Sequence, residues 1–370
     1  MKKSYLSLAA VVLLGSTTLN ADTLEDVFKK STLEGSIGWY GHTYDRKGGS
    51  ANDGFSNGFG AIHFETAPLY GFSVGLSGFG SFKTSEENDG DYKATIEDRA
   101  VLSEAYIKVE HEGVGHVIVG RQEVDFNWMT DVIEGATIEL SFVENFIINM
   151  AWMHKQAVIG FDEISETFET KNGHKGVYML EAKYTPVEGL EINPYYYYAH
   201  DVFNAPGVKV SLSFEPQDEL KTTTLLAYTK GNSDVAGILD GYVVQLEQGV
   251  EFMSATVALG YIKTDKNGTA GLESFGDQSP FEEGNHVFDA DTQSYYVTAS
   301  YTMGDVSVGG LYGQSTYDNV GNKEKEKEFN LSFGYKILEN LETSFVYVNV
   351  DNEDNAQSYT GIKALVEYKF

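Results

Sequence analysis

Hydrophobic and polar residues alternate with a period of two through most of the chain. The final stretch shows this clearly, because charged residues separate the apolar positions Ile362, Ala364, Val366, Tyr368 and Phe370. Such a pattern, with one apolar and one polar face, is typical of a β-strand that has different surroundings on its two sides. Similar alternating runs of roughly ten residues recur from position 33 onward. The pattern therefore predicts an all-β protein with many strands.

Short and long connections alternate between these runs. Short turns are expected at residues 67–71, 112–115, 186–189, 303–305 and 339–341. Long loops are expected over residues 45–57, 84–98, 156–175, 264–291, 319–327 and 351–358. This asymmetry is typical of transmembrane antiparallel β-barrels, which have short periplasmic turns and long extracellular loops. Such barrels usually have an even strand number, and the runs predict about 18 strands, with about 16 as the alternative.

The N-terminus has the features of a secretory signal peptide. Two lysines at positions 2 and 3 precede an apolar run over residues 6–14, and a small-residue cleavage site ends at Ala21. We therefore expect residues 1–21 to be a signal peptide and residues 22–370 to form one barrel domain. Leu24, Val27 and Phe28 have helical spacing and predict a short helical segment before the first strand.

Composition agrees with a barrel and excludes several other classes. The mean hydropathy is −0.27, as expected where only alternate residues meet lipid, and 24 Tyr and 22 Phe suit aromatic girdles at the membrane interfaces. There is no cysteine, so disulfide scaffolds and thiolate metal sites are excluded. The net charge of −29 argues against nucleic acid as a partner, because phosphate binding needs the opposite sign.

The polar faces of the predicted strands carry charges of both signs. Examples are Glu104, Lys108 and Lys183, which we expect on the lumen wall. A charge on the lipid face would cost about 2–4 kcal/mol near the membrane midplane, so these side chains should point toward water. At this strand number side chains do not fill the interior, which predicts a water-filled lumen.

One predicted loop, over residues 122–135, mixes large apolar residues with carboxylates. Such residues suit a loop that folds back into the barrel and lines its narrowest point with Asp125, Asp131 and Glu134. Two of the few arginines, Arg99 and Arg121, are candidates for a cationic wall opposite them. The alternative is an ordinary acidic surface loop. Together with the acidic mouth loops over residues 84–98 and 264–291, the carboxylates predict a modest preference for cations.

Several segments resemble one known family. They are Leu24-Glu-Asp-Val-Phe-Lys-Lys30 before the first strand, Val119-Gly-Arg-Gln122 ahead of the acidic stretch, Ile133-Glu-Gly-Ala136, which is similar to the family's FEGA motif, and the final Phe370. Together they resemble the Opr-type porins of Gram-negative outer membranes, which are related to substrate-selective porins with about 18 strands. The basic residues here are mostly lysines, whereas the family has an arginine-rich ladder in its lumen.

The resemblance implies an outer-membrane porin through which small hydrophilic solutes and ions diffuse passively. Its partners would be outer-membrane lipid and lipopolysaccharide, and the barrel-assembly machinery, which would recognise Tyr368 and Phe370 on the last strand. Monomer and homotrimer are both compatible with the sequence.

Functions from other classes give weaker predictions. A structural or adhesive barrel, whose acidic extracellular loops bind a surface partner, is the alternative to a channel. An enzyme is not expected, since none of the eight histidines stands in a GxSxG or HExxH context. No cofactor and no metal site is expected either.

Overall fold

The computed structural model describes residues 23–165, 168–276 and 278–370, and the expected signal peptide lies outside these ranges. Within them a short helix, α1 (Leu24–Lys29), precedes the first strand, as its spacing predicted. The strands follow in the order β1 (Thr32–Arg46), β2 (Asp53–Glu65), β3 (Phe72–Glu86), β4 (Ala100–His111), β5 (Gly115–Phe126), β6 (Met129–Val143), β7 (Phe146–Ala157), β8 (Glu169–Thr170), β9 (Val177–Val187), β10 (Leu190–Ala199), β11 (Phe203–Gln217), β12 (Leu220–Ser233), β13 (Gly241–Phe252), β14 (Ala255–Thr264), β15 (Gln293–Met303), β16 (Val306–Asn319), β17 (Asn322–Leu338), β18 (Leu341–Asn352) and β19 (Tyr359–Lys369).

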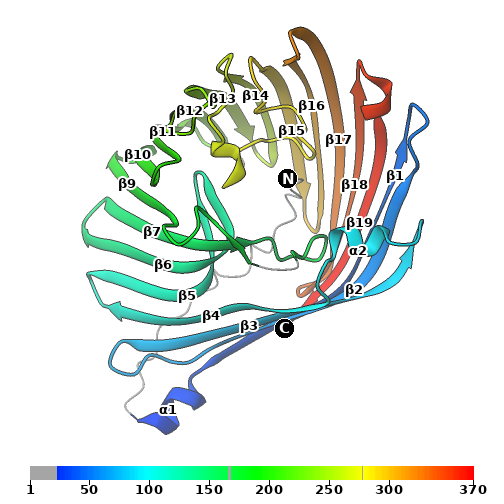
Figure 1. The fold of residues 1–370 in the computed structure, drawn as a ribbon. Coiled ribbons are helices and arrows are strands. Elements are labelled where there is room, and N and C mark those ends of the chain that lie inside the picture. The colour runs from blue at the N-terminus through cyan, green and yellow to red at the C-terminus, as the bar shows by residue number, and fades with distance from the viewer. Residues whose placement is uncertain (1–22, 166–167, 277) are drawn as a thin grey trace.

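These strands form one closed antiparallel barrel (Figure 1). Each long strand pairs with its neighbours in sequence, and β1 pairs with β19 from Ser36↔Lys369 to Arg46↔Tyr359, which closes the ring. The two-residue strand β8 pairs only with β7, at Lys155↔Thr170 and Gln156↔Glu169, and is additional to the 18 strands of the ring. The prediction of about 18 strands is confirmed. Closure leaves no free sheet edge, whose unpaired backbone groups lipid could not hydrogen-bond.

Alternation along each strand separates an inner from an outer face. On β19, Lys363 and Glu367 are buried inside, whereas Ile362, Val366 and Tyr368 are exposed outside. Charged groups thus face the interior and apolar groups face outward, as the period-two pattern predicted. None of the helices in the described part of the chain is long and apolar enough to cross a membrane.

Aromatic side chains on the outer face form pairs near both rims. Toward the rim with the long loops, Tyr228 and Tyr242 have ring centroids 6.2 Å apart, and Tyr261 and Tyr295 are 4.8 Å apart. Near the other rim, the rings of Tyr368 and Phe370 stack at 6.4 Å. Such rings at two levels are the arrangement expected of interfacial girdles.

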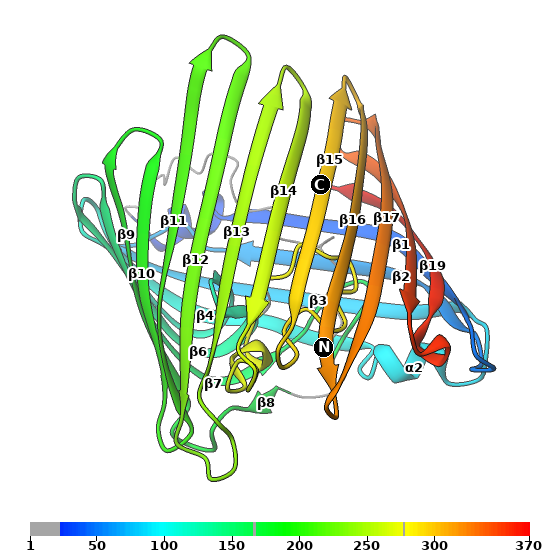
Figure 2. The same ribbon diagram turned by 90° about the horizontal axis from the view of Figure 1, so that it is seen from above.

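The two rims differ as the turn pattern predicted. Figure 2 shows tight turns at one rim, and α2 (Asp91–Thr95), β8 and the longer loops at the other. Two further one-turn elements, η2 (Leu272–Ser274) and η3 (Asn355–Gln357), lie in those longer loops.

Two stretches expected as loops are instead strands. Residues 319–327 belong to β16 and β17, which are joined by the turn residues Val320 and Gly321. In β17 the run of alternating Lys and Glu is a strand pattern, because Glu326 and Glu328 are buried inside and Lys325 and Lys327 are exposed. A period of two in charge is as good a strand signal as a period of two in hydrophobicity.

The loop expected over residues 122–135 is likewise a β-hairpin. Strand β5 continues to Phe126 and β6 begins at Met129, so only Asn127 and Trp128 form the connection. The loop prediction for this stretch was wrong. The apolar residues that suggested a folded loop are hairpin residues, and they pack on the barrel's inner wall.

Candidate functional site

The tip of the β5–β6 hairpin bends into the barrel and contacts strands far around the ring. The backbone N–H of Trp128 donates to Tyr197 Oη on β10 at 2.9 Å, and its indole Nε1–H donates to Thr229 Oγ1 on β12 at 3.0 Å. Neighbouring Asn127 donates from Nδ2 to Asn193 Oδ1 at 2.6 Å and to Glu181 Oε2 at 3.2 Å. Because β5 and β12 are not neighbours in the sheet, these contacts cross the interior.

The loop between β14 and β15, called L7 here (residues 265–292), packs on that hairpin tip. Phe288 of L7 lies with its ring centroid 5.4 Å from that of Trp128. Phe275 of the same loop accepts hydrogen bonds at its carbonyl oxygen from Thr130 N at 3.3 Å and from Gln156 Nε2 at 3.1 Å. Leu272, Phe275, Phe281 and Val287 are buried in one cluster with inner-wall residues. L7 therefore lies inside the ring of strands, as Figure 1 shows.

The loop between β7 and β9 is called L4 here (residues 158–176), and its first part, with Phe161 and Ile164, lies in the opposite part of the interior. Its Phe161 ring lies 5.0 Å from the Tyr40 ring on β1, and its carbonyl oxygen accepts from Asn57 Nδ2 on β2 at 2.8 Å. L4 also bonds to the segment that contains α2, since Glu97 N donates to Ile164 O at 2.9 Å. The hairpin tip, L4 and L7 thus all narrow the interior near one rim.

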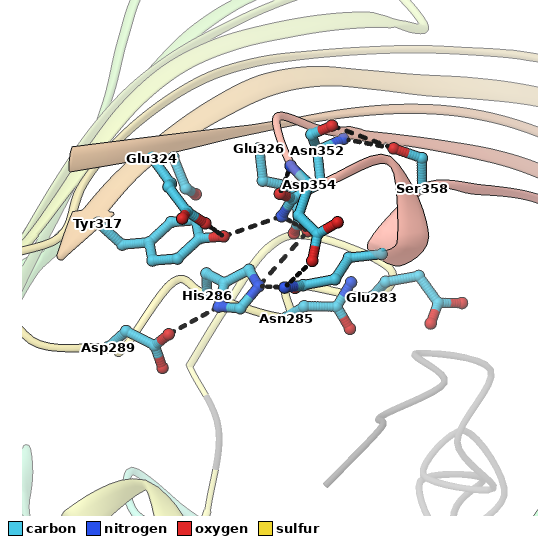
Figure 3. Close-up of polar contacts among 12 residues, drawn as sticks. Glu283, Asn285, His286, Asp289, Tyr317, Glu324, Glu326, Asn352, Asp354 and Ser358 are labelled. Atoms are coloured by element: carbon cyan, nitrogen blue, oxygen red, sulfur yellow. Dashed lines mark hydrogen bonds and ion pairs between the residues drawn. The ribbon is translucent and has the colours of Figure 1, made fainter. Parts of the chain in front are cut away.

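A polar cluster joins L7 to the wall formed by β16, β17 and β18 (Figure 3). His286 of L7 stacks on Tyr317 with ring centroids 3.9 Å apart, and its Nδ1 lies 2.7 Å from Asp289 Oδ2. Its Nε2 lies 3.0 Å from Gln357 Oε1 and 3.7 Å from Glu326 Oε2. Burial alone would lower the pKa of His286, but Asp289 and Glu326 outweigh it and hold the pKa above its ordinary value.

Arg121 and Glu134 do not lie across a pore from one another. They are direct cross-strand partners on β5 and β6, with Arg121 Nε 3.2 Å from Glu134 Oε2, and Lys155 Nζ lies 3.1 Å from Glu134 Oε1. Alternation places Arg121 on the same face as Val119, which is 56% exposed on the outside of the barrel. The expectation that this pair faces the lumen was wrong, because it rested on a loop where the chain forms a regular ladder.

The remaining expected constriction residues are also dispersed. Asp125 lies on the same face of β5 as Arg121 and is exposed. Arg99 is exposed in the connection between β3 and β4. The Asp131 carboxylate accepts from Gln156 Nε2 of β7 at 3.3 Å, and the same amide donates to Phe275 O of L7. The Arg121 guanidinium carbon lies 4.1 Å from the centroid of the Phe168 ring in L4. These five residues therefore do not form one site.

The three wall residues expected in the lumen lie on the inner face. Glu104 of β4 contacts Ser77 and lies 3.1 Å from His63 Nδ1. Lys108 of β4 lies 3.3 Å from Glu110, and Lys183 of β9 lies 3.5 Å from Glu181. The inner wall thus carries charges of both signs in local pairs.

Sequence reasoning missed the residues on which the inward loops are docked. Glu181, Asn193 and Thr229 bind the hairpin tip, and Glu326 and Glu328 contact L7. The signal that could have found the two glutamates is their alternation with lysines in residues 323–328. No comparable signal exists for Thr229, because its role depends on a contact 101 residues distant in sequence. Among the described residues, no group of three or more His, Cys, Asp or Glu side chains has the arrangement of a metal site.

Comparisons with known proteins decide the family. Residues 7–352 match the family HP_OMP_2, described as "Putative outer membrane protein". The chain belongs to this outer-membrane protein family. Nothing among the curated proteins matches the chain. The fold and the family place the barrel in the bacterial outer membrane, with the tight turns toward the periplasm.

Solved structures with the same fold are porins that resemble the family suggested by the sequence motifs. Acinetobacter baumannii OccAB4 has a TM-score of 0.78 at 14% identity, over 96% of this chain and 99% of that chain. Pseudomonas aeruginosa OccK8 (OprE) has a TM-score of 0.76 at 11% identity, over 95% and 99%. Pseudomonas aeruginosa OccD3 (OpdP) has a TM-score of 0.73 at 14% identity, over 91% and 90%. At these identities the likeness establishes the fold of an 18-stranded porin.

Proposed function

We propose that this protein is a passive diffusion channel for small hydrophilic solutes and ions. The observation that carries the proposal is the charged inner face of a closed 18-strand ring, with Glu104, Lys108, Lys183 and their partners turned inward. Ionised groups of both signs are stable on such a wall where water reaches them or where opposite charges pair, and Lys108, Lys183 and Glu104 are partly exposed inside the ring. The porin folds of OccAB4 and OccK8 (OprE) support the same function.

The narrow part of this channel is formed by the β5–β6 hairpin tip, L4 and L7. The hairpin tip packs on L7, and L4 packs on the inner wall at β1 and β2, whereas most of the acidic stretch expected as a constriction loop lies in strands. The channel prefers cations modestly. Acidic residues of the extracellular loops, which outnumber the basic ones, raise the local cation concentration at the mouth.

Planar-bilayer recording of the purified barrel tests this function. Stable ion conductance, with a reversal potential of cation sign in a salt gradient, is the expected result. The rival function is a structural or adhesive barrel, in which the acidic loops bind a surface partner and the lumen is blocked. Folded protein that inserts but stays electrically silent would favour that rival.

A further inference from the structure

A buried carboxylate on the wall holds the backbone of L7. Glu328 Oε1 accepts hydrogen bonds from the backbone N–H of Glu282 at 2.8 Å and of Glu283 at 3.1 Å, and its Oε2 accepts from Gly284 N at 2.9 Å. Glu328 lies on the inner face of β17 and is 2% exposed. Three backbone N–H groups that converge on one buried carboxyl group make directional hydrogen bonds to it. These three bonds are not part of the β17 backbone ladder, so what they stabilise is the position of L7 on the wall.

A second wall residue, Lys363 of β19, holds the side chains of the same segment. Its Nζ lies 2.7 Å from Glu282 Oε1 and 2.9 Å from Glu283 Oε1. Glu283 also accepts from Tyr44 Oη at 2.9 Å and from Tyr359 Oη at 3.1 Å. Glu283 is thus enclosed by one ammonium and two phenol groups, as a buried charge requires.

The ion pairs change what Lys363 can do in a channel. A lysine on the wall of a water-filled lumen is ordinarily free to attract anions. The Lys363 side chain is 5% exposed and has two glutamates within 3 Å, so a passing anion meets neither a free charge nor an open approach.

Backbone conformation at the end of the segment also favours this placement. Gly284 has φ +56°, and a Cβ there would lie 2.8 Å from Ser279 Oγ. At the start of the segment, Phe281 packs against the inner wall at Gly313 of β16, where a Cβ would lie 2.3 Å from the Phe281 ring. Gly284 thus permits the turn within L7, and Gly313 allows Phe281 to lie close to the backbone of β16.

We propose that Lys363 and Glu328 are positioning residues that hold residues 281–284 of L7 in the lumen and thereby set the width of the channel. In this role Lys363 does not act as an anion-attracting wall charge. The inference rests on the proposed channel function. It assigns the channel's dimensions to two side chains on β17 and β19.

The test compares single-channel conductance of Lys363→Met, Glu328→Gln and Lys336→Met. Lys336 serves as the matched control, because it is an exposed lysine on the inner face of β17, remote from the L7 contacts. We expect conductance to rise by about twofold, and open-channel noise to rise, in Lys363→Met and in Glu328→Gln, since a loop freed from the wall widens the constriction. Lys336→Met should keep the wild-type conductance and shift the reversal potential slightly toward cations.

Lys363→Met and Glu328→Gln together distinguish the possible roles of Lys363. Unchanged conductance in Lys363→Met together with a cation shift like that of Lys336→Met would overturn the proposal, because it is the signature of a lost anion-attracting charge. Unchanged conductance in Glu328→Gln would also overturn it, since this variant removes no positive charge. Heat-modifiable migration on gels identifies folded barrels, and if Lys363→Met does not fold, Glu328→Gln alone decides. A wild-type protein that does not conduct would instead refute the proposed channel function.

Discussion

Trp128 and Thr229 are joined by a hydrogen bond of 3.0 Å between the indole Nε1–H and the threonine Oγ1. The bond connects the tip of one hairpin to a strand on another side of the ring, and it lies in a buried cluster with Phe275, Phe281 and Val287 of L7. A side chain that is 2% exposed and packed on three separate elements determines where the hairpin tip lies.

Substitutions of Trp128 should therefore widen the channel without opening the barrel. Trp128→Phe removes one hydrogen bond, at roughly 1 kcal/mol, and should give a small increase in open-channel noise. Trp128→Ala also leaves a cavity, at about 3–5 kcal/mol, and should raise single-channel conductance clearly. Wild-type conductance in Trp128→Ala, with normal heat-modifiable migration, would show that the hairpin tip does not limit ion flow.

A second prediction concerns His286 and alkaline pH. Its raised pKa means that the charged form, which bridges Asp289 and Glu326, stabilises the L7 contact fully below the ordinary histidine pKa. This contribution is lost as pH rises through the raised value, and the neutral ring then leaves Asp289 and Glu326 without a positive charge between them.

The expected result is open-channel noise that increases as pH rises above neutral. His286→Gln should be noisy throughout and insensitive to pH in this window, because it removes a charge-assisted contact of roughly 1–2 kcal/mol. His111→Gln, at an exposed turn on the opposite rim, is the control and should behave as wild type. Equal pH responses in all three proteins would exclude His286 as the titrating group.

A third prediction concerns Asp162 of L4, which follows the inward-facing Phe161. Burial, with the nearby charges of Glu163 and Glu282 adding and Lys363 opposing, raises the pKa of Asp162 to about 7. The carboxyl is therefore neutral at lower pH and becomes negative as pH passes through that value. We expect cation preference, measured as reversal potential in a salt gradient, to increase across this range.

Asp162→Asn should abolish the pH-dependent part of the preference, whereas Asp89→Asn, an exposed acid between β3 and β4, should retain it. If the reversal potential of the Asp162→Asn protein depends on pH as in wild type, another group carries the charge that governs selectivity.

The last prediction concerns the strand pair that closes the barrel. Phe370 exchanges both backbone hydrogen bonds with Gly35 of β1 at 2.9 Å, and its ring occupies the place that a Cβ on Gly35 would need, 2.8 Å away. Phe370→Ala should reduce assembly in the outer membrane, because the β1–β19 pair loses the ring that covers Gly35 and stacks on Tyr368. Quantitative blotting of outer-membrane fractions measures this loss, and Phe345→Ala, also on the outer face, is the matched control. Normal levels of the Phe370→Ala protein would contradict an assembly role.

The sequence by itself determined the barrel. Alternation in segments such as β19 specifies which face meets lipid, and the alternation of short and long connections specifies an antiparallel ring of about 18 strands. These properties are local, since a side chain's face in a strand depends only on its position in the period of two. Lys363 and Glu367 could thus be placed on the inner face before any contact was known.

Only the tertiary structure decided how the interior is filled. The hairpin at Trp128 and the segment 281–284 of L7 are held by Thr229, Glu328 and Lys363, each far away in sequence. Arg121 and Glu134 show the same limit, because carboxylates near arginines suggested a pore lining, whereas strand register makes them partners on the outer side. A loop has no period that fixes its path, so its position follows from the free energy of contacts with distant strands.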